Sequence, residues 1–435
     1  MLLNDAKGAK LDGQPVRSIH LGSMPILPGI TNLATNPGFE TTSGVVEVRR
    51  NLATDPLGAS PLGTSWARQW FGTSGAGTYT QAPSGRGVRK TWTTGGTQSW
   101  DNGVGPNIVQ TLPAGDKLSV SLKETIVACP NGLPPTGSRR LHVGFLDAGG
   151  GSLGAQYGPS VTFASMQIGV PVEYRLDGIT IPAGAARVVI YPQETAYNAH
   201  PTAIGTIIDT TDPVVEIAPI AGVYFAPGIP SPDPDLTPAW IGAANSSQSV
   251  LTGLGVVGGP GSAAMYVGYV RCVSSQLWHR SGSRSARLIP SSASNDSRIS
   301  PGGDGGALRL GMLPGRTYTA LGTIRLTAPQ TGTLSSLARR IVVYTHSGVG
   351  YVPIASSQPP NVAGEHEVRL TFTVPATATE AFVRLYNGAS AGNGDVWWDD
   401  FMLVEGEYTG PYRDGDSPGW VWNGTAHGST SQGLG

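Results

Sequence analysis

The sequence predicts an all-β protein built from two tandem β-sandwich domains that follow a short N-terminal segment. Three observations lead to this prediction. The chain has 62 Gly and 35 Pro among 435 residues, yet 39% of its residues are hydrophobic, with 10 Trp and 14 Tyr, so turns are frequent and a folded core is still possible. Several short stretches alternate apolar and polar residues, as strands do. No stretch of a dozen residues shows the apolar spacing of a helix without a Gly or Pro interrupting it.

The elements follow in chain order. Residues 1–30 form a lead-in that ends in the Pro- and Gly-rich string MPILPGITN. In DKLSVSLKE, the apolar Leu118, Val120 and Leu122 alternate with polar residues, and HEVRLTFTVPA shows the same pattern from Val368 onward. Short strands of this kind, joined by Gly and Pro turns, are typical of sandwiches or barrels and not of a parallel sheet.

An internal repeat indicates that the domain is duplicated. The phrase Trp-x-Gly-x-Ala-x-x-Ser-x-Ser starts at Trp240 and again at Trp422, a separation of 182 residues (422 − 240). This period is far longer than the roughly 20 to 50 residues of solenoid repeats, so the repeated unit is a whole domain. We therefore predict one sandwich over residues 31–249 and another over 250–435, with the two Trp packed at equivalent sandwich ends. Three further pairs of similar strings occur in the same order, at 84–90 and 281–288, 112–122 and 313–326, and 175–191 and 369–386.

Composition excludes several classes of function. The net charge is −1 and charged residues make up 13% of the chain, so no nucleic acid or anionic membrane is expected as a partner. No run of eighteen apolar residues occurs, so no membrane insertion is expected, and Asp5 and Lys7 interrupt the stretch where a signal peptide would be apolar. Cys129 and Cys272 fall in different repeats, which argues against a structural disulfide.

Three strings resemble the carbohydrate-binding jelly-roll modules of the family 4 and 9 type, in which an Asn-Pro-x-Phe-Glu opening lies beside an aromatic-Asp-Asp-hydrophobic closing strand. They are TNLATNPGFE at 31–40, RRNLATDP at 49–56 and TFTVPATATEAFVRLYNGASAGNGDVWWDDFMLVEG at 371–406. The opening motif is clear only in the first copy, because the second starts with YVGYVRCVSSQ. The ending YRDGDSPGWVWNGTAHGSTS resembles the C-termini of minor tail proteins of actinobacteriophages. The resemblance implies two jelly-roll sandwiches in a tail-tip or fibre protein.

The same resemblance implies a structural calcium ion. In such modules the second Asp of the closing strand and the Glu of the opening motif are commonly its ligands. Carried over, this implies Asp400 in the second domain, and Glu40 with Asp209 or Asp212 in the first. Asp399 and Asp400 also stand out because adjacent carboxylates in an aromatic strand are costly without partners. The alternative is that these carboxylates accept hydrogen bonds from loop amides.

A candidate glycan contact comes from the string GDVWWDDFML, whose alternation leaves neither face apolar. A one-residue bulge at 399–400 would point Trp398, Phe401 and Leu403 into the core and leave Trp397 outside. An exposed indole can stack on a sugar ring, so Trp397 is the predicted contact. The alternative is a Trp397 buried under a loop or against another subunit.

Two catalytic-looking motifs have simpler interpretations. GDSPG at 415–419 fits the nucleophile elbow of serine hydrolases, but it lies in a strand-rich tail and only His427 follows it, so Ser417 is expected to be a turn residue. GLGVVG at 253–258 fits a dinucleotide-binding pattern without the helix that the pattern needs, and is expected to be a linker. No zinc-ligand spacing or pair of catalytic carboxylates stands out.

We therefore predict a non-enzymatic minor tail protein of a phage virion, in the tail tip or fibre. Its expected partners are other phage tail proteins, further copies of itself, and host envelope polysaccharide; calcium is the one expected cofactor. Residues 1–30 are expected to order only against another tail subunit or the sandwiches. One alternative is a free carbohydrate-binding protein, for which a secretion signal would be expected. The other is a glycan hydrolase or esterase, for which a catalytic constellation would be expected.

Overall fold

We describe a computed structural model of the chain. Before residue 30 it describes only four two-residue strands, β1 (Lys10–Leu11), β2 (Gln14–Pro15), β3 (His20–Leu21) and β4 (Met24–Pro25), which pair as β1 with β2 and β3 with β4. From residue 30 onward it describes everything except 35–37, 41, 60–64, 69–76, 94–103, 134–135, 195–204, 219–220, 245–246, 257–270, 290–297, 330–338, 347–349, 388–393, 428 and 434–435.

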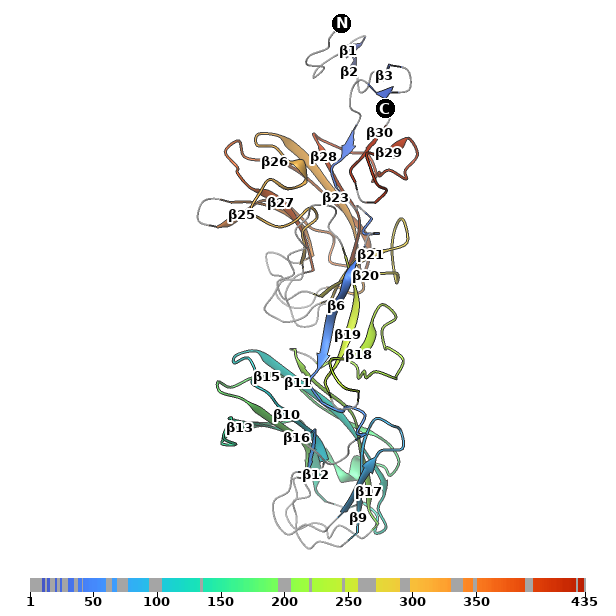
Figure 1. The fold of residues 1–435 in the computed structure, drawn as a ribbon, viewed down its shortest axis with the longest axis vertical. Coiled ribbons are helices and arrows are strands. Elements are labelled where there is room, and N and C mark those ends of the chain that lie inside the picture. Colours follow the sequence, from blue (N-terminus) through green and yellow to red (C-terminus); the bar gives the residue numbers. More distant parts are fainter. Residues whose placement is uncertain are drawn as a thin grey trace. The chain divides into compact units, whose positions relative to one another are not determined.

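The chain divides into two compact units. Unit 1 comprises residues 1–46 and 253–435, and unit 2 comprises residues 47–252. Each unit is a sandwich of two antiparallel sheets (Figure 1), which confirms the predicted all-β class. The only helical segments in the described part of the chain are single 3-10 turns, Phe163–Ser165 and Arg309–Gly311. No described helix is long and apolar enough to cross a membrane.

Unit 2 packs its two sheets around one core. Leu118, Val120 and Leu122 are buried in this core against Leu141 and Val143 of the facing sheet, so the predicted alternation is confirmed. The first sheet has the order β13 (Ser152–Tyr157), β12 (Ser138–Leu146), β16 (Arg187–Glu194), β10 (Val104–Val109), β7 (Trp66–Arg68), with β14 (Val161–Thr162) also on β12. The second has the order β15 (Val172–Thr180), β11 (Lys117–Ala128), β17 (Ile207–Ile217), β9 (Gly87–Trp92), β8 (Gly77–Gln81).

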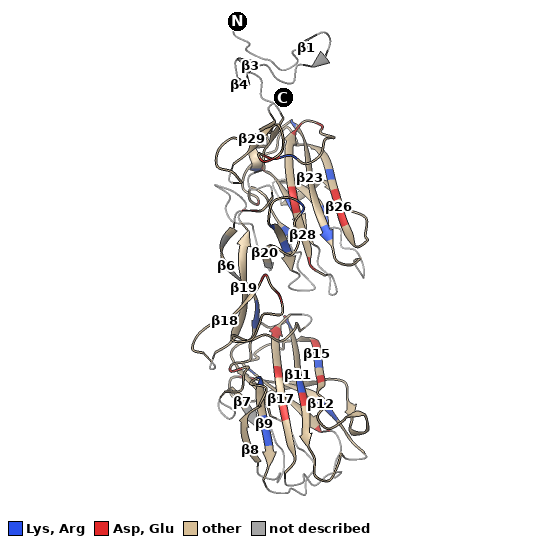
Figure 2. Cartoon of the chain, turned by 90° about the vertical axis from the view of Figure 1, so that its right-hand side faces the viewer, with Lys and Arg blue, Asp and Glu red and all other residues tan. Residues whose placement is uncertain are grey.

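Unit 1 repeats the same strand orders, so the predicted duplication is visible in the topology. One sheet runs β26 (Gly364–Thr373), β23 (Thr317–Leu326), β28 (Val396–Glu405), β21 (Ser285–Ile289), β20 (Arg271–Ser275). The other runs β25 (Tyr351–Ser357), β24 (Ile341–His346), β27 (Ala381–Tyr386), β22 (Arg298–Ile299). Figure 2 shows both basic and acidic residues on β11 and β26, whereas the charged residues of β17 are all acidic.

The repeated Trp phrases form equivalent hairpins. Trp240 pairs with Ser249 and Trp422 pairs with Ser431. The predicted equivalence of the two Trp is therefore confirmed, but both are only partly buried. The hairpins belong to two three-stranded sheets of matching order, β18 (Thr237–Trp240), β19 (Ser249–Val256), β6 (Thr42–Asn51) and β29 (Trp420–Trp422), β30 (Ser431–Gly433), β5 (Thr31–Asn32).

A string of four residues just before the opening motif occurs again 19 residues later, so that each unit has one copy. Asn-Leu-Ala-Thr occupies 32–35 and again 51–54. The amide of Leu33 donates to the carbonyl of Leu403 (2.7 Å), and the amide of Leu52 donates to the carbonyl of Val215 (2.7 Å). Each opening therefore lies along the closing strand of its own unit, β28 in unit 1 and β17 in unit 2.

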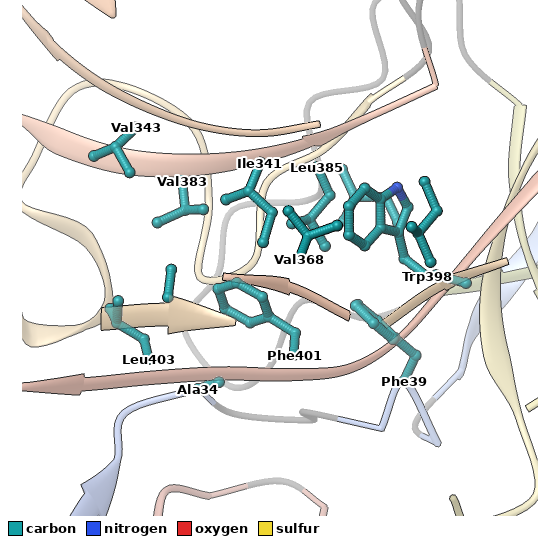
Figure 3. Close-up of a cluster of buried hydrophobic side chains, with 14 of the residues drawn as sticks. Ala34, Phe39, Ile341, Val343, Val368, Val383, Leu385, Trp398, Phe401 and Leu403 are labelled. Carbon is teal, nitrogen blue, oxygen red and sulfur yellow. The ribbon is translucent and has the colours of Figure 1, made fainter. Parts of the chain in front are cut away.

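This pairing places residues 31–46 with the second sandwich and not, as expected, with the first. Ala34 and Phe39 are buried in the core of unit 1, beside Phe401 and Trp398 (Figure 3). Unit 2 is consequently inserted after the opening of unit 1, so the domains are nested in the sequence. The physical reason is that Phe39 finds its apolar partners on β28.

Candidate functional site

Glu40 binds a loop of unit 1. Its Oε1 accepts hydrogen bonds from the amides of Ser283 (2.7 Å) and Arg284 (2.9 Å), and its Oε2 accepts from the hydroxyl of Ser283 (2.7 Å). The expected grouping of Glu40 with Asp209 or Asp212 is therefore wrong, because both of those residues lie in unit 2. Glu40 instead belongs with Asp399 and Asp400 of its own unit.

The two adjacent carboxylates of β28 are fully buried. Asp399 accepts from the amides of Arg280 (2.6 Å), Ser281 (3.2 Å) and Asp400 (2.8 Å), while Asp400 accepts from the hydroxyl of Ser281. Burial and the neighbouring Asp400 raise the pKa of Asp399 to about 8, and burial also raises the pKa of Asp400. These contacts match the alternative in which loop amides satisfy the carboxylates.

The strand bulges next to these carboxylates. Leu321 pairs with Met402 and Thr323 pairs with Asp399, so two residues, Asp400 and Phe401, oppose one. Asp400 has φ of 54°, a left-handed conformation that Asp tolerates better than most residues. The predicted bulge therefore exists, one residue later than expected. The predicted core residues are confirmed: Trp398, Phe401 and Leu403 are buried in unit 1.

Asp209 and Asp212 form ion pairs in unit 2. The guanidinium of Arg89 binds Asp209 through Nε (2.7 Å) and Nη2 (2.9 Å). Asp212 occupies the equivalent bulge with φ of 52°, and the ammonium of Lys123 lies 3.1 Å from its Oδ2. Protein cations therefore neutralise both carboxylates.

The described residues do not fit the expected calcium site. In the described part of the chain, no group of three or more acidic, His or Cys side chains is arranged so that it could hold a metal ion. The four expected ligands are divided between the units, and each already has donors or a cation beside it. Calcium binding stays a prediction.

Trp397 does not offer a free ring, so its expected exposure is wrong. The side chain is 7% exposed and its Nε1 donates to the hydroxyl of Ser275 (2.9 Å). The guanidinium groups of Arg287 and Arg325 lie 5.4 Å and 6.0 Å from the ring centroid. Trp397 points away from the core as predicted, but other side chains cover it.

Ser417 lies in a turn, as expected. Its hydroxyl donates to Asp414 Oδ1 (3.0 Å), whereas His427 pairs with Asp416 (3.2 Å). The serine and the histidine therefore bind different carboxylates, and no Ser-His hydrogen bond of the kind a hydrolase uses joins these two described residues.

The clearest candidate site is a groove on the outer face of the first sheet of unit 2. It encloses a cavity of about 700 Å³. Its centre is aromatic: the rings of His142 and Tyr191 stack with centroids 4.5 Å apart, and Tyr157 meets His142 edge-on at 5.1 Å. Its other lining residues are Gly144, Leu146, Ser152, Gly154, Ala155, Arg187, Val189 and Gln193.

Strand alternation places these side chains. On β16, Val188 and Ile190 point into the core, so Val189, Tyr191 and Gln193 point into the groove. Gly144 keeps space open on β12, because a Cβ there would lie 2.9 Å from the ring of His142. Adjacent strands β12, β13 and β16 thus present a flat aromatic floor.

The groove is neutral at its centre and cationic beside it. Arg140 stacks over the ring of Tyr157 (3.8 Å to the centroid), and its Nε and Nη2 both donate to Gln193 Oε1 (3.2 Å). Burial, with a smaller contribution from Arg140, lowers the pKa of His142 to about 4, so its imidazole is uncharged at neutral pH.

The equivalent face of unit 1 is also aromatic. Tyr344 and Phe382 stack there (5.5 Å), but they are 5% and 0% exposed. The guanidinium of Arg384 lies 4.7 Å from the Tyr344 centroid and binds both carboxylate oxygens of Asp304 (2.7 Å each). Tyr191 in unit 2 is buried to a similar extent (2% exposed), and each face has one exposed tyrosine, Tyr157 (44%) and Tyr351 (46%). The two related faces therefore differ chiefly in the partners of their arginines.

Sequence reasoning missed the groove entirely. The string RVVIYPQE is apolar or aromatic on both faces over most of its length, so alternation does not stand out. One feature of the sequence does indicate the groove. Tyr191 and Gln193 lie on one face of a strand whose other face is aliphatic.

Comparisons with known proteins give weak structural similarities. No known family model matches the chain, and no curated protein sequence matches it. Among solved structures, the chain is similar to the N-terminal CBM22-1-CBM22-2 tandem domain of Xyn10C from Paenibacillus barcinonensis (TM-score 0.26, 13% identity, 84% of this chain and 100% of that one). It is also similar to a family 16 carbohydrate-binding module (TM-score 0.25, 17% identity, 32% and 90%). The enzymatically active domain of tailspike protein 4 of bacteriophage CBA120 is a further match (TM-score 0.27, 15% identity, 38% and 21%). At these scores none assigns a ligand or an activity to this chain.

Proposed function

We propose that this protein binds a glycan in the groove of unit 2 and has no catalytic activity. The observation that carries the proposal is an open cavity of about 700 Å³ with an aromatic floor. Tyr157 is 44% exposed and offers ring surface on which a sugar can stack, while the exposed Ser152 supplies a hydrogen-bonding hydroxyl. A shallow groove on a rigid sheet suits an extended polysaccharide.

We further propose that the chain is a minor tail protein of a phage virion, placed in the tail tip or fibre with other tail proteins and further copies of itself. The support is the resemblance of its last residues to minor tail proteins and the duplicated sandwich architecture. In this setting the groove would contribute to adsorption on host envelope polysaccharide.

The binding test uses two matched tyrosines. Tyr157, the last residue of β13, is 44% exposed, and Tyr351, the first residue of the corresponding strand β25 of unit 1, is 46% exposed. Tyr157→Ala should weaken retention on immobilised host envelope polysaccharide about tenfold or more, and Tyr351→Ala should leave it unchanged. Equal retention of all three proteins, with equal melting temperatures, would show that the groove is not the binding site.

The location and the lack of catalysis have separate tests. An antibody against the chain should label the tail in electron micrographs of purified virions, and unlabelled tails would reject the virion role. Incubation with envelope polysaccharide and ester substrates should release no product, and release that Ser417→Ala abolishes would reject the non-enzymatic role.

A further inference from the structure

The charges around the groove have one sign. None of the eleven residues that line the cavity is acidic, and Arg187 is among them. Arg140 lies immediately beside the groove, over Tyr157. Because His142 is neutral, the local charge comes from guanidinium groups alone.

Both arginines are oriented by uncharged partners, so no carboxylate neutralises their charge. Arg187 Nε donates to Asn107 Oδ1 (3.1 Å), which orients the guanidinium through a neutral partner. Arg140 is likewise oriented by the neutral amide of Gln193 and the ring of Tyr157. Within the described residues, no carboxylate lies within salt-bridge distance of either arginine. A fixed guanidinium is well suited to a carboxylate or phosphate group.

The two arginines lie toward opposite ends of the groove. Arg140 pairs in register with Gln193, and Arg187 is at the start of the same strand β16. Six residues separate Arg187 from Gln193, which is about 20 Å along a strand. Only an extended ligand could reach both ends while crossing Tyr191 at the centre.

Unit 1 provides an internal comparison. Its arginine on the equivalent face, Arg384, is 8% exposed and is neutralised by Asp304. An arginine kept only for packing can therefore have an acidic partner in this fold. In unit 2 the groove arginines Arg187 and Arg140 are oriented by amides instead, which leaves their charge for a ligand.

We infer that the groove of unit 2 selects an anionic polysaccharide, whose carboxylate or phosphate groups bind Arg187 and Arg140 while an uncharged part of the chain crosses the aromatic floor. This inference rests on the proposed glycan-binding function and adds the charge class of the ligand.

The experiment compares charged glycans with their neutralised forms. The full-length protein is applied to an array of neutral, uronate-bearing and phosphate-bearing oligosaccharides. Each hit is then titrated beside its carboxyl-reduced or phosphatase-treated derivative, which keeps the same backbone. Arg187→Gln is the test variant. Arg50→Gln is the control, because Arg50 is an exposed arginine of unit 2 that pairs with Glu47 outside the groove.

We expect the hits to be anionic and their neutralised forms to bind about tenfold more weakly or worse. Arg187→Gln should cause a similar loss for the anionic form alone, and Arg50→Gln should cause none. Raising NaCl from 50 to 500 mM should also weaken the anionic form selectively. Binding to uronate-bearing glycans alone, or to phosphate-bearing glycans alone, would identify which anionic group the groove binds.

Two outcomes would overturn the inference and are distinguishable. If charged and neutralised glycans bind equally and Tyr157→Ala abolishes both, the groove binds glycans without charge selection and the proposed function stands. If the wild-type protein binds no glycan of either class, the proposed function fails together with the inference.

Discussion

An ion pair inside unit 2 joins the two sheets of the sandwich. Arg139 on β12 binds Glu124 on β11 through Nε to Oε2 (2.8 Å) and Nη2 to Oε1 (2.9 Å), and the two side chains are 3% and 2% exposed. Replacing Arg139 removes the guanidinium from beside the buried carboxylate of Glu124. We expect Arg139→Leu to lower the free energy of unfolding by about 3 to 5 kcal/mol.

The double variant Arg139→Met with Glu124→Leu separates charge from packing. It should recover most of the lost free energy, since buried ion pairs are often replaceable by apolar residues. Urea unfolding of the single and double variants checks this. A single variant within about 1 kcal/mol of wild type would mean that water reaches the pair.

Asp399 makes unit 1 sensitive to pH. Its pKa in the folded chain is raised to about 8 by burial and by Asp400, so the folded state holds a proton that the unfolded state releases near pH 4. The stability that this proton contributes is complete below about pH 4 and is lost as pH rises toward 8.

The corresponding measurement is melting temperature against pH for wild type and Asp399→Asn. The variant should lose less stability than wild type between pH 5 and 8, because it has no proton to release. Parallel curves would show that the three amide donors to Asp399 hold its pKa near the ordinary value.

Among the elements, the closing strands β28 and β17 share the same kind of bulge. Each bulges at an Asp in a left-handed conformation, Asp400 in one and Asp212 in the other, and each runs beside an Asn-Leu-Ala-Thr opening. In unit 2 the carboxylate faces the ammonium of Lys123, and in unit 1 it faces the hydroxyl of Ser281. Both environments satisfy the carboxylate with protein groups.

This arrangement predicts the response to a chelator. Because protein donors already surround Glu40, Asp399 and Asp400, treatment with EDTA should leave the melting temperature unchanged within about 1 °C. Differential scanning calorimetry with and without 1 mM calcium provides the comparison. A rise of several degrees with calcium, lost in Asp400→Asn, would show that a metal ion displaces these donors.

The sequence predicted elements well where one face of a strand is polar. The alternation in β11 and β26 predicts half-buried strands, and the structure confirms this for β26. In β11 the alternate apolar residues face the core as predicted, but Ser119 and Ser121 on the other face are buried as well. The sequence did not predict the groove, because β16 is buried along nearly its whole length and its two faces differ only in aromatic against aliphatic character. The sequence correctly predicted that Trp397 faces away from the core. It could not predict that Arg287 and Arg325 cover the Trp397 ring, because these residues come from other strands.

At the scale of the molecule, the sequence showed that a domain is repeated but not that one copy is inserted in the other. The two openings are 19 residues apart (51 − 32), so they look like consecutive parts of one domain. Only the pairing of Leu33 with Leu403, and of Leu52 with Val215, assigns each opening to its unit.

Nesting predicts which fragments fold. Residues 47–252 contain every strand of unit 2's two main sheets and should unfold cooperatively when expressed alone. Residues 253–435 lack β5, Ala34 and Phe39, and Phe39 is 2% exposed in the core of unit 1. That fragment should be less stable by about 3 to 5 kcal/mol or fail to fold.

The control joins residues 30–46 to 253–435 through a short Gly-Ser linker, which should restore stability. Thermal unfolding by circular dichroism distinguishes the three fragments. If 253–435 alone melted at the same temperature as the joined form, the opening segment would be dispensable.

The insertion of unit 2 into unit 1 also determines the order in which the two units can fold during synthesis. Leu33 is made early, but its partner Leu403 follows 370 residues later (403 − 33), which at roughly 5 to 20 residues per second is a delay of roughly 20 to 70 s. Unit 2 is completed within that interval. Since β6 and β19 belong to one sheet, a folded unit 2 holds its own two ends together, and the entropy cost of closing the long loop is already met when β28 emerges. Folding of the inserted unit 2 thus lowers the entropy cost of folding unit 1.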